Sequence, residues 1–314
     1  MIDGVILVQK PCRLTSHDVV DRIRKIFSIR KVGHFGTLDP LATGLLLVGI
    51  GRATRLFPFF SGLDKAYIGS LTFGTATDTY DSEGRPTGPG CREFPPRSKI
   101  DRALEHFRGA IRQIPPPFSA KKIGGKPSYL LAREKKSVQL EAVPVTIHAF
   151  SPTEYLPPVL DFEVECSSGT YIRSLAHDLG RQLSCGAHLT RLVRTRIGRF
   201  SLEDSHTLET LETAASENRT HQVILPMEQL FPEWTKITLT NGGAALASNG
   251  NLITPEDILS ISALNSSKTS SHSGSEPVLR LFNTEGRLLA FARKHPEKTG
   301  LHPFLVVGDA NNHA

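Results

Sequence analysis

The sequence predicts an α+β fold in two parts. Short apolar or alternating segments typical of strands are mixed with amphipathic helical segments, but they do not follow one another as regular β-α-β units. A length of 314 residues favours one large domain and one small domain. After Trp234 the composition changes to strand-like pieces around Gly-rich turns. We therefore expect a mixed sheet core with flanking helices over residues 1–232 and a small β-rich domain over residues 233–314.

The first third of the chain supplies the predicted elements in order. Residues 4–8 are a short apolar run typical of a buried strand, and residues 15–18 (Thr-Ser-His-Asp) have the pattern of a capping box that starts a helix. Residues 66–75 alternate like a half-buried strand, whereas residues 79–97 have the Gly, Pro and charge content of a loop. Apolar residues at helical spacing follow Ser98, so a helix is expected there.

The remaining elements follow the same rules. Residues 114–128 contain too much Pro and Gly for regular structure, and residues 143–167 indicate an antiparallel pair of strands. A helix is expected after Gly169-Thr170, because apolar residues recur at helical spacing from there. Residues 235–253 are expected to be strand-like, and residues 262–276 to form a Ser- and Gly-rich surface loop.

Basic residues gather in three stretches, residues 22–34, 119–136 and 186–200, in which Glu134 is the sole acidic residue. The whole chain carries a formal net charge of +6, so the rest of the chain is net acidic. Segregated positive charge is typical of proteins that bind a polyanion such as nucleic acid. Three solvated surface faces remain an alternative explanation.

The composition argues against several classes of protein. The four cysteines form no Cys-x-x-Cys pair, so neither a zinc site nor a disulfide framework is expected. No run approaches the roughly 18 apolar residues of a membrane span, and the first residues lack the pattern of a signal peptide. We expect a cytoplasmic protein without a membrane segment or a structural metal.

Asp39 is the most unusual residue of the sequence, because it stands in an apolar and glycine-rich stretch, residues 33–44. Pro40 restricts Asp39 to extended backbone angles, and the neighbouring glycines allow tight turns or the close approach of another segment. A rigid acid on such a loop suits a nucleophile or a base. An ordinary turn, in which Asp39 caps a backbone N–H, explains the pattern equally well.

Arg173 is the second unusual residue. It lies near the expected start of its helix, where the helix dipole disfavours a cation by about 0.3–1 kcal/mol. Its neighbours one turn on are Ala176 and His177, so no carboxylate of its own helix can compensate. Either Arg173 extends into water, or it pairs with an anion that its own helix does not supply. Asp39 and an RNA phosphate are the two candidates.

Tyr67 and Tyr171 are two of five tyrosines in the chain. A single tyrosine on a strand usually serves packing. Two aromatic rings beside a carboxylate have another use, because a nucleobase sandwiched between them gains roughly 1–3 kcal/mol per stacking contact.

Five stretches, taken in order, resemble the TruB family of tRNA pseudouridine synthases. They are residues 4–20, 33–55, 64–84, 107–133 and 167–200. The fourth resembles an insertion found in the bacterial tRNA enzymes and lacking in their guide-RNA-dependent relatives. The similarity is nearly continuous from residue 4 to about residue 232, so it implies the pseudouridine-synthase fold for the large domain.

The resemblance also implies the roles of single residues. Asp39 corresponds to the nucleophile, and Arg173 to its ion-pair partner. Tyr67 would stack on the target uracil and act as a base. Tyr171 and Leu192 would line the pocket that receives the base.

Further implied roles concern RNA binding. His34 would take the place of the flipped nucleotide in the RNA. The basic insertion, at about residues 112–142, would close on the T-arm of tRNA like a thumb, with Lys121 and Lys122 in contact with it. The C-terminal domain resembles a PUA-like RNA-binding module. The implied enzyme isomerises the T-loop uridine at tRNA position 55 as a monomer, without cofactor, metal, guide RNA or partner protein.

Two residues depart from the family pattern, and two rival functions remain. Phe35 replaces a small polar residue beside His34, and Arg13 replaces a glycine. A non-catalytic tRNA-folding chaperone would use the same RNA-binding surface. An N-glycosylase that releases the base would need a second carboxylate to activate water, and the sequence places none near Asp39.

Overall fold

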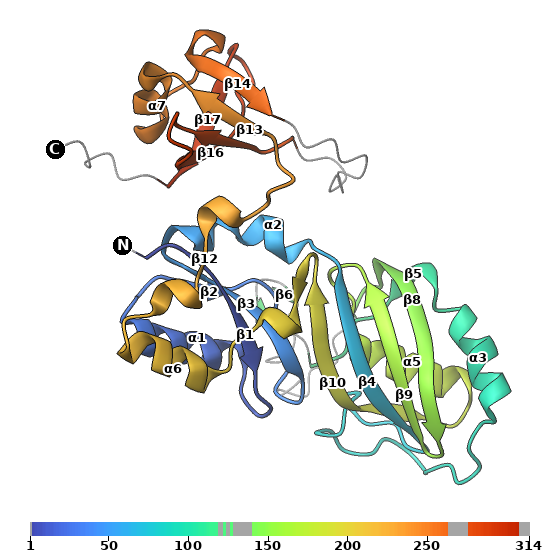
Figure 1. Cartoon of the computed structure of the whole chain (residues 1–314). Coiled ribbons are helices and arrows are strands. Elements are labelled where there is room, and N and C mark those ends of the chain that lie inside the picture. The colour runs from blue at the N-terminus through green and yellow to red at the C-terminus, as the bar shows by residue number, and fades with distance from the viewer. Residues whose placement is uncertain (1, 119–121, 124–125, 128–139, 263–275, 308–314) are drawn as a thin grey trace.

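The computed structural model describes residues 2–118, 122–123, 126–127, 140–262 and 276–307. Two separate sheets dominate the molecule (Figure 1). Ten strands and the helices beside them form a large body, and five strands form a smaller C-terminal body. This organisation confirms the predicted α+β class.

The large sheet is mixed and mostly antiparallel. Its strands are β1 (Gly4–Lys10), β2 (Val32–His34), β3 (Thr43–Ile50), β4 (Lys65–Phe73), β5 (Gly109–Gln113), β8 (Val143–Leu156), β9 (Val159–Cys166), β10 (Ala187–Ile197), β11 (Phe200–Ser201) and β12 (Leu225–Pro226). Their order is β12-β1-β3-β10-β4-β9-β8-β5, with β2 added to β3 and β11 to β10. The pairing of β3 with β10 is parallel and matches Thr43 with Val193 and Gly44 with Arg194. It places the loop before β3 beside the middle of β10.

Helices lie against the large sheet. They are α1 (Ser16–Phe27), α2 (Phe57–Ser61), α3 (Arg97–Glu105), α5 (Ile172–Gln182) and α6 (Leu208–Ser216). α1 and α6 contact each other beside β1, whereas α5 packs on β10 and α3 on β8 (Figure 1). The predicted capping box of α1 is confirmed, because the Thr15 hydroxyl accepts from the Asp18 N–H and the Asp18 carboxylate accepts from the Thr15 N–H.

β1 is buried on both faces, which explains its continuous apolar sequence. Ile6 and Val8 face the cluster under α1 and α6. Val5 and Leu7 face a second cluster that reaches toward the C-terminal body. All four side chains are at most 8% exposed, so the N-terminal strand is a central element of the core.

Aromatic side chains join the small C-terminal body to the large one. The strands of the small sheet are β13 (Lys236–Leu239), β14 (Ile258–Ser262), β15 (Leu279–Phe282), β16 (Leu288–Lys294) and β17 (Leu301–Val306), in the order β14-β13-β15-β16-β17. The rings of Trp234 and Phe231 stack with 3.9 Å between their centroids, and the Phe59 ring of α2 lies 5.0 Å from Trp234. Arg55 donates a hydrogen bond of 2.7 Å to the Phe304 carbonyl.

One secondary-structure prediction for the C-terminal region was wrong. Part of the stretch expected to be strand-like forms a helix, α7 (Asn241–Ser248). The Thr240 side chain caps this helix by accepting from the Gly243 N–H at 3.0 Å, and the helix contains three alanines. Capping and alanine content outweigh the glycine content on which the prediction relied.

The region of the basic insertion also differs from expectation. Residues 114–128 were expected to lack regular structure, but they contain the short paired strands β6 (Lys122–Ile123) and β7 (Lys126–Pro127). The predicted Ser-rich loop at 262–276 lies almost wholly outside the described residues.

Candidate active site

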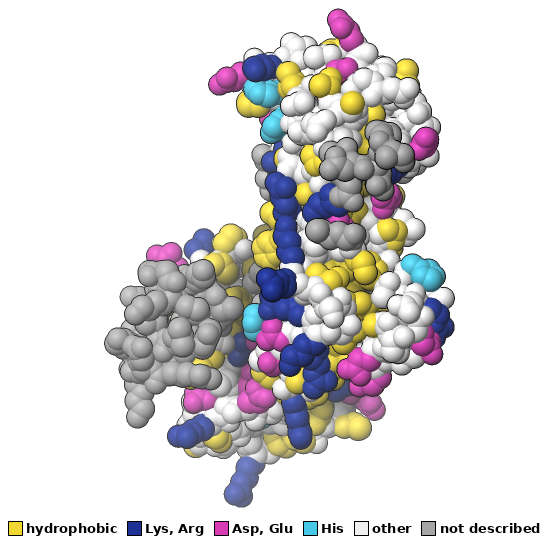
Figure 2. Space-filling view, turned by 90° about the vertical axis from the view of Figure 1, so that its left-hand side faces the viewer, with side chains coloured by type: hydrophobic (Ala, Val, Ile, Leu, Met, Phe, Trp, Pro, Cys, Tyr) yellow, Lys and Arg dark blue, Asp and Glu magenta, His cyan; other side chains and the backbone are white. Residues whose placement is uncertain are grey.

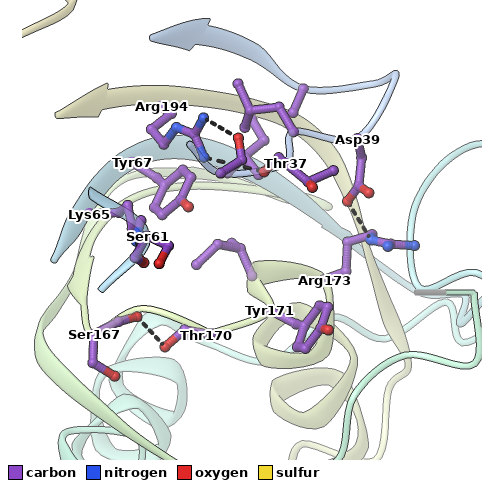
Figure 3. A pocket seen from close by; sticks show the side chains of 16 residues that line it. Thr37, Asp39, Ser61, Lys65, Tyr67, Ser167, Thr170, Tyr171, Arg173 and Arg194 are labelled. Atoms are coloured by element: carbon purple, nitrogen blue, oxygen red, sulfur yellow. Dashed lines mark hydrogen bonds and ion pairs between the residues drawn. The ribbon is translucent and has the colours of Figure 1, made fainter. Parts of the chain in front are cut away.

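A cavity of about 240 Å³ opens where five segments of the large body meet (Figure 3). These segments are the loop before β3, the end of α2, strand β4, the turn into α5, and strand β10. Five of the predicted site residues line it: Asp39, Tyr67, Tyr171, Arg173 and Leu192. The fold therefore brings together side chains that are far apart in the sequence.

The loop that carries Asp39 is anchored on both sides. The Ser16 hydroxyl, at the start of α1, donates to the Leu38 carbonyl at 3.1 Å and accepts from the Leu38 N–H at 2.8 Å. The Arg13 N–H donates to the Pro40 carbonyl at 2.8 Å. Because the residues before and after Asp39 are both fixed, its carboxylate is presented to the cavity in a defined position.

Arg173 binds Asp39 and three further groups. Its Nε lies 2.9 Å from Oδ2 of Asp39, so the predicted ion pair is confirmed (Figure 3). One Nη donates to the Thr79 carbonyl at 3.0 Å and lies 3.3 Å from the Asp81 carboxylate. The other Nη donates to the Phe118 carbonyl at 2.9 Å. With a side chain only 7% exposed, Arg173 is a fixed hub and not a solvated cation.

Asp81 is a second carboxylate at this site, which the sequence reasoning missed. Its side chain is 4% exposed, pairs with Arg173, and also accepts hydrogen bonds from the Thr79 hydroxyl and the Glu83 N–H. The expectation that no second carboxylate lies near Asp39 was therefore wrong. Asp81 is nevertheless not among the residues that line the cavity. It contacts the Arg173 guanidinium without facing the cavity itself. The signal in the sequence was the polar run Thr-Asp-Thr-Tyr-Asp at 77–81.

Opposing influences act on the Asp39 carboxyl. Burial in the cavity wall is the largest and raises its pKa, and the nearby Asp81 raises it further. Arg173 and Lys10 lower it without reversing the shift. The side chain is still 40% exposed because it faces the open cavity. Arg173 thus favours the ionised form, as predicted, but burial outweighs its effect.

Tyr67 lines the cavity and is 8% exposed. Burial raises the pKa of its phenol, so the hydroxyl keeps its proton at neutral pH. Lys65, two residues earlier on β4, faces the same cavity and is 6% exposed. Its ammonium donates to the carbonyls of Ser61 and Leu63 at 2.8 and 2.6 Å. Burial lowers the pKa of Lys65 to about 8.

Arg194 is a cavity residue that the sequence reasoning counted only as part of a basic stretch. Its side chain is 1% exposed, so this charge is not available at the surface. It lies where β10 meets β3, at a point where Gly44 has a φ of +100° and a Cβ would come within 2.4 Å of the Arg194 carbonyl oxygen. Glycine is required there, and the close contact brings the arginine beside the loop that carries Asp39.

The turn into α5 is held by Gln113 at the end of β5, another residue that was missed. The Gln113 side chain accepts from the Tyr171 N–H at 2.7 Å and donates to the Tyr171 carbonyl at 3.0 Å. Tyr171 is the N-cap of α5, so this contact sets both the tyrosine and the helix that carries Arg173.

His34 does not line the cavity. It ends β2 and is half-buried, and burial lowers its pKa, so the imidazole is neutral at pH 7. The neighbouring Phe35 points away from it into the core. The Phe35 ring is 1% exposed and stacks on Phe60 at 4.5 Å. Gly49 leaves room for it, because a Cβ at Gly49 would lie 2.2 Å from the ring.

Arg13 is the other departure from the family pattern, and Lys121 and Lys122 are the predicted RNA contacts of the insertion. Arg13 has a φ of +68°, a left-handed conformation that favours glycine, which explains why glycine suits this position. Lys122 belongs to β6, and Lys121 lies outside the described residues.

The described residues contain neither a cluster of metal-binding side chains nor a membrane-spanning helix. Within the described part of the chain, no group of three or more His, Cys, Asp or Glu side chains is placed to hold a metal ion. No helix of the described residues has the length and apolar character needed to cross a membrane.

Comparison with known sequences gives a consistent family. The model of the TruB family pseudouridylate synthase N-terminal domain matches residues 24–172, and that of the tRNA pseudouridylate synthase B C-terminal domain matches residues 173–232. The tRNA pseudouridine synthase B of Solibacter usitatus is 44% identical over 249 residues, which cover 79% of this chain and 85% of the relative. That of Mycobacterium tuberculosis is 42% identical over 253 residues, covering 79% and 83%.

Solved structures share the fold across both bodies. A chain of an H/ACA ribonucleoprotein bound to a substrate RNA containing 2′-deoxyuridine gives a TM-score of 0.71 at 24% identity and covers 98% of this chain and 86% of its own length. A chain of a Cbf5–Nop10–Gar1 complex gives 0.69 at 25% identity, covering 98% and 84%. The matched family models and the close sequence relatives agree with the cavity built from the predicted motifs. The chain therefore belongs to the TruB family of pseudouridylate synthases.

Proposed function

We propose that this protein isomerises uridine to pseudouridine in the T-loop of tRNA, at position 55. The observation that carries the proposal is the ion pair of Asp39 and Arg173 in a cavity beside Tyr67. The relatives that share 40–44% of the sequence are named tRNA pseudouridine synthase B, which supports tRNA as the substrate.

The reaction breaks the bond between ribose C1′ and uracil N1, turns the base, and joins C1′ to C5. A base inside folded RNA cannot turn, so it must first be flipped into a pocket at a cost of a few kcal/mol. In the proposed complex the base lies between Tyr67 and Leu192, and Asp39 is the nucleophile. The atoms of the product are those of the substrate, so the reaction requires no group-transfer or redox cofactor.

The electrostatics of the cavity suit this assignment. A nucleophilic carboxylate must be ionised, and Arg173 stabilises that form against the effect of burial. The raised pKa of Tyr67 favours a neutral phenol that stacks and donates a hydrogen bond over a tyrosine that starts the reaction as a base. The partly apolar wall limits water, which protects a sugar intermediate from hydrolysis. Asp81 pairs with Arg173 and does not line the cavity, so it is not placed to activate a water molecule for base release. This favours isomerisation over an N-glycosylase reaction.

The proposed RNA contacts extend beyond the cavity. His34 and the basic insertion with Lys121 and Lys122 would hold the T-arm, and the C-terminal body would act as a PUA-like RNA-binding domain. Lys and Arg side chains recur along the face seen in Figure 2, from the small body to the large one, as expected for a surface that meets phosphates. We expect a cytoplasmic monomer that acts without guide RNA or partner protein.

Tritium release tests the function directly. A tRNA transcript labelled with tritium at uridine C5 is incubated with native protein, Asp39→Asn, and Asp101→Asn as a matched control on the surface of α3. Native protein and Asp101→Asn should release tritium from the T-loop uridine, and Asp39→Asn should not. Folded native protein that binds tRNA but releases no tritium would refute the proposed isomerisation and leave an RNA-binding protein.

A further inference from the structure

Arg194 is a buried cation whose charge no role proposed above explains. Its side chain is 1% exposed and lines the cavity. No carboxylate among the described residues forms an ion pair with it, and burying a charge without a counter-ion is costly. Burial accordingly lowers its pKa, and Asp39 and Tyr67 act in the opposite direction.

Three backbone carbonyls partly replace the missing counter-ion. The Nε of Arg194 donates to the Leu45 carbonyl at 2.8 Å, and its two Nη atoms donate to the carbonyls of Thr37 and Gly36 at 3.2 and 3.1 Å (Figure 3). These carbonyls belong to the loop before Asp39 and to the start of β3. A purely structural role in holding this loop is therefore the alternative that any functional proposal must exclude.

Tyr67 lies opposite Arg194 in the pairing of β4 with β10. Both side chains line the cavity, and the charge of Arg194 lowers the pKa of Tyr67, against the larger effect of burial. A guanidinium has donors and no acceptor, so in a contact between these two side chains the phenol oxygen is the acceptor. The phenol proton is then left for a partner in the cavity.

A second buried cation strengthens the positive field around this phenol. Lys65 lies two residues from Tyr67 on β4 and donates to the carbonyls of Ser61 and Leu63, not to a carboxylate. The Arg194 charge contributes to its lowered pKa. The cavity wall on this side is therefore positive, at the place where the proposed reaction puts negative charge on the departing base. Fixed charges and dipoles of this kind stabilise developing charge effectively in a site with little water.

We propose that Arg194 is a positioning residue of the isomerisation: it fixes the Tyr67 hydroxyl so that its proton points to the base, and its charge stabilises the base as an anion. This inference rests on the proposed function. It assigns a role to a residue that donates hydrogen bonds to the loop before Asp39 and lies opposite the proposed stacking tyrosine in the strand pairing.

Two substitutions separate charge from loop anchoring. Arg194→Lys keeps the charge but has fewer directed donors, whereas Arg194→Gln keeps a donor for the loop and removes the charge. The matched control is Arg196→Gln on the same strand, because Arg196 pairs with Glu165 and does not line the cavity. Urea unfolding of each variant establishes that it is folded.

Single-turnover tritium release with enzyme in excess provides the rates, together with tRNA Kd values. We expect Arg194→Gln to lower the rate by about 100-fold with little change in Kd, Arg194→Lys to retain most of the rate, and Arg196→Gln to behave as native. In a Tyr67→Phe background, where no hydroxyl remains to be oriented, Arg194→Gln should cost only a few-fold more.

Two results would overturn the role of Arg194 while leaving the proposed function intact. One is an Arg194→Lys variant as slow as Arg194→Gln, which would assign the residue to loop anchoring. The other is a full additional loss in the Tyr67→Phe background. Absence of tritium release by the native protein would instead refute the proposed function itself.

Discussion

Gln113 holds the backbone of Tyr171 from both sides, with hydrogen bonds of 2.7 Å to its N–H and 3.0 Å to its carbonyl. The glutamine is 1% exposed and is the last residue of β5, so a rigid strand fixes the residue from which α5 starts. Arg173 lies two residues further on. The position of Arg173 therefore depends on the side-chain amide of a residue on strand β5.

We expect Gln113→Leu to lower both stability and activity. The substitution leaves the N–H of Tyr171 without its partner, at a cost of about 1–3 kcal/mol. The Tyr171 carbonyl keeps only its hydrogen bond from the Leu175 N–H, at 3.2 Å. Urea unfolding should show this loss, and tritium release should fall because Arg173 shifts relative to Asp39. Gln182→Leu, at an exposed position of α5, is the control and should change stability by less than about 0.5 kcal/mol. A Gln113→Leu protein with native stability and rate would show that the contact has no such function.

Asp81→Asn should produce two separable effects. The Asp81 charge raises the pKa of Asp39, so its removal allows Asp39 to ionise at lower pH, and the acidic limb of the pH–rate profile should move to lower pH. The same change weakens the 3.3 Å contact that holds Arg173, so the maximal rate should fall by roughly 10-fold or more.

Single-turnover rates measured across the pH range test both effects of Asp81→Asn. Asp101→Asn, which removes a carboxylate paired with Arg97 on the surface of α3, should leave the profile unchanged. A limb that moves to higher pH would contradict the expected direction of the Asp39 pKa change. An unchanged maximal rate would show that Asp81 is not needed to hold Arg173.

The sequence was sufficient to predict the elements and the residues that carry strong local signals. The capping box at Thr15, the helix after Gly169-Thr170 and the rigid acid at Asp39 are all defined by near neighbours in the chain. Because Arg173 had no carboxylate on its own helix, Asp39 and an RNA phosphate were both open as partners, and the resemblance to the TruB family implied the pair with Asp39. Such cases depend on local chemistry, which a single sequence records.

The residues that were missed act through long-range contacts. Gln113 and Asp81 are ordinary polar residues until the fold places them against Tyr171 and Arg173. Arg194 stands in a run of arginines that looks like a basic surface, and only the pairing of β10 with β3 and β4 shows that it is buried. Burial of a charge depends on the tertiary structure, so composition and spacing could not predict it.

Phe35 is expected to affect stability and not RNA binding. Its ring fills the space above Gly49 and stacks on Phe60, so Phe35→Ala should cost about 3–5 kcal/mol. Phe35→Leu should cost less than about 1.5 kcal/mol and keep native tRNA affinity. The control is Phe57→Ala, because Phe57 is 47% exposed. Urea unfolding and tRNA titration check these values, and a stable Phe35→Leu protein with altered affinity would place the ring at the RNA after all.

The proposed thumb predicts a change in the salt dependence of binding. Replacing Lys121, Lys122 and Lys126 together with alanine should weaken tRNA binding, because each lysine that neutralises a phosphate releases counterions. The slope of log affinity against log salt should become shallower by about 0.7–0.9 for each lysine–phosphate pair that the substitutions remove. Affinities measured at several salt concentrations provide this slope directly.

The matched control removes the same number of charges from α3, on the edge of the large sheet that lies far from α2 in Figure 1. It replaces Arg97, Lys99 and Arg102 with alanine. This variant should keep the native slope, because the proposed path of the T-arm runs over the insertion and the cavity and does not reach α3. Equal flattening in both variants would mean that general positive charge attracts the tRNA, whereas an unchanged slope in the lysine variant would remove the insertion from the proposed binding surface.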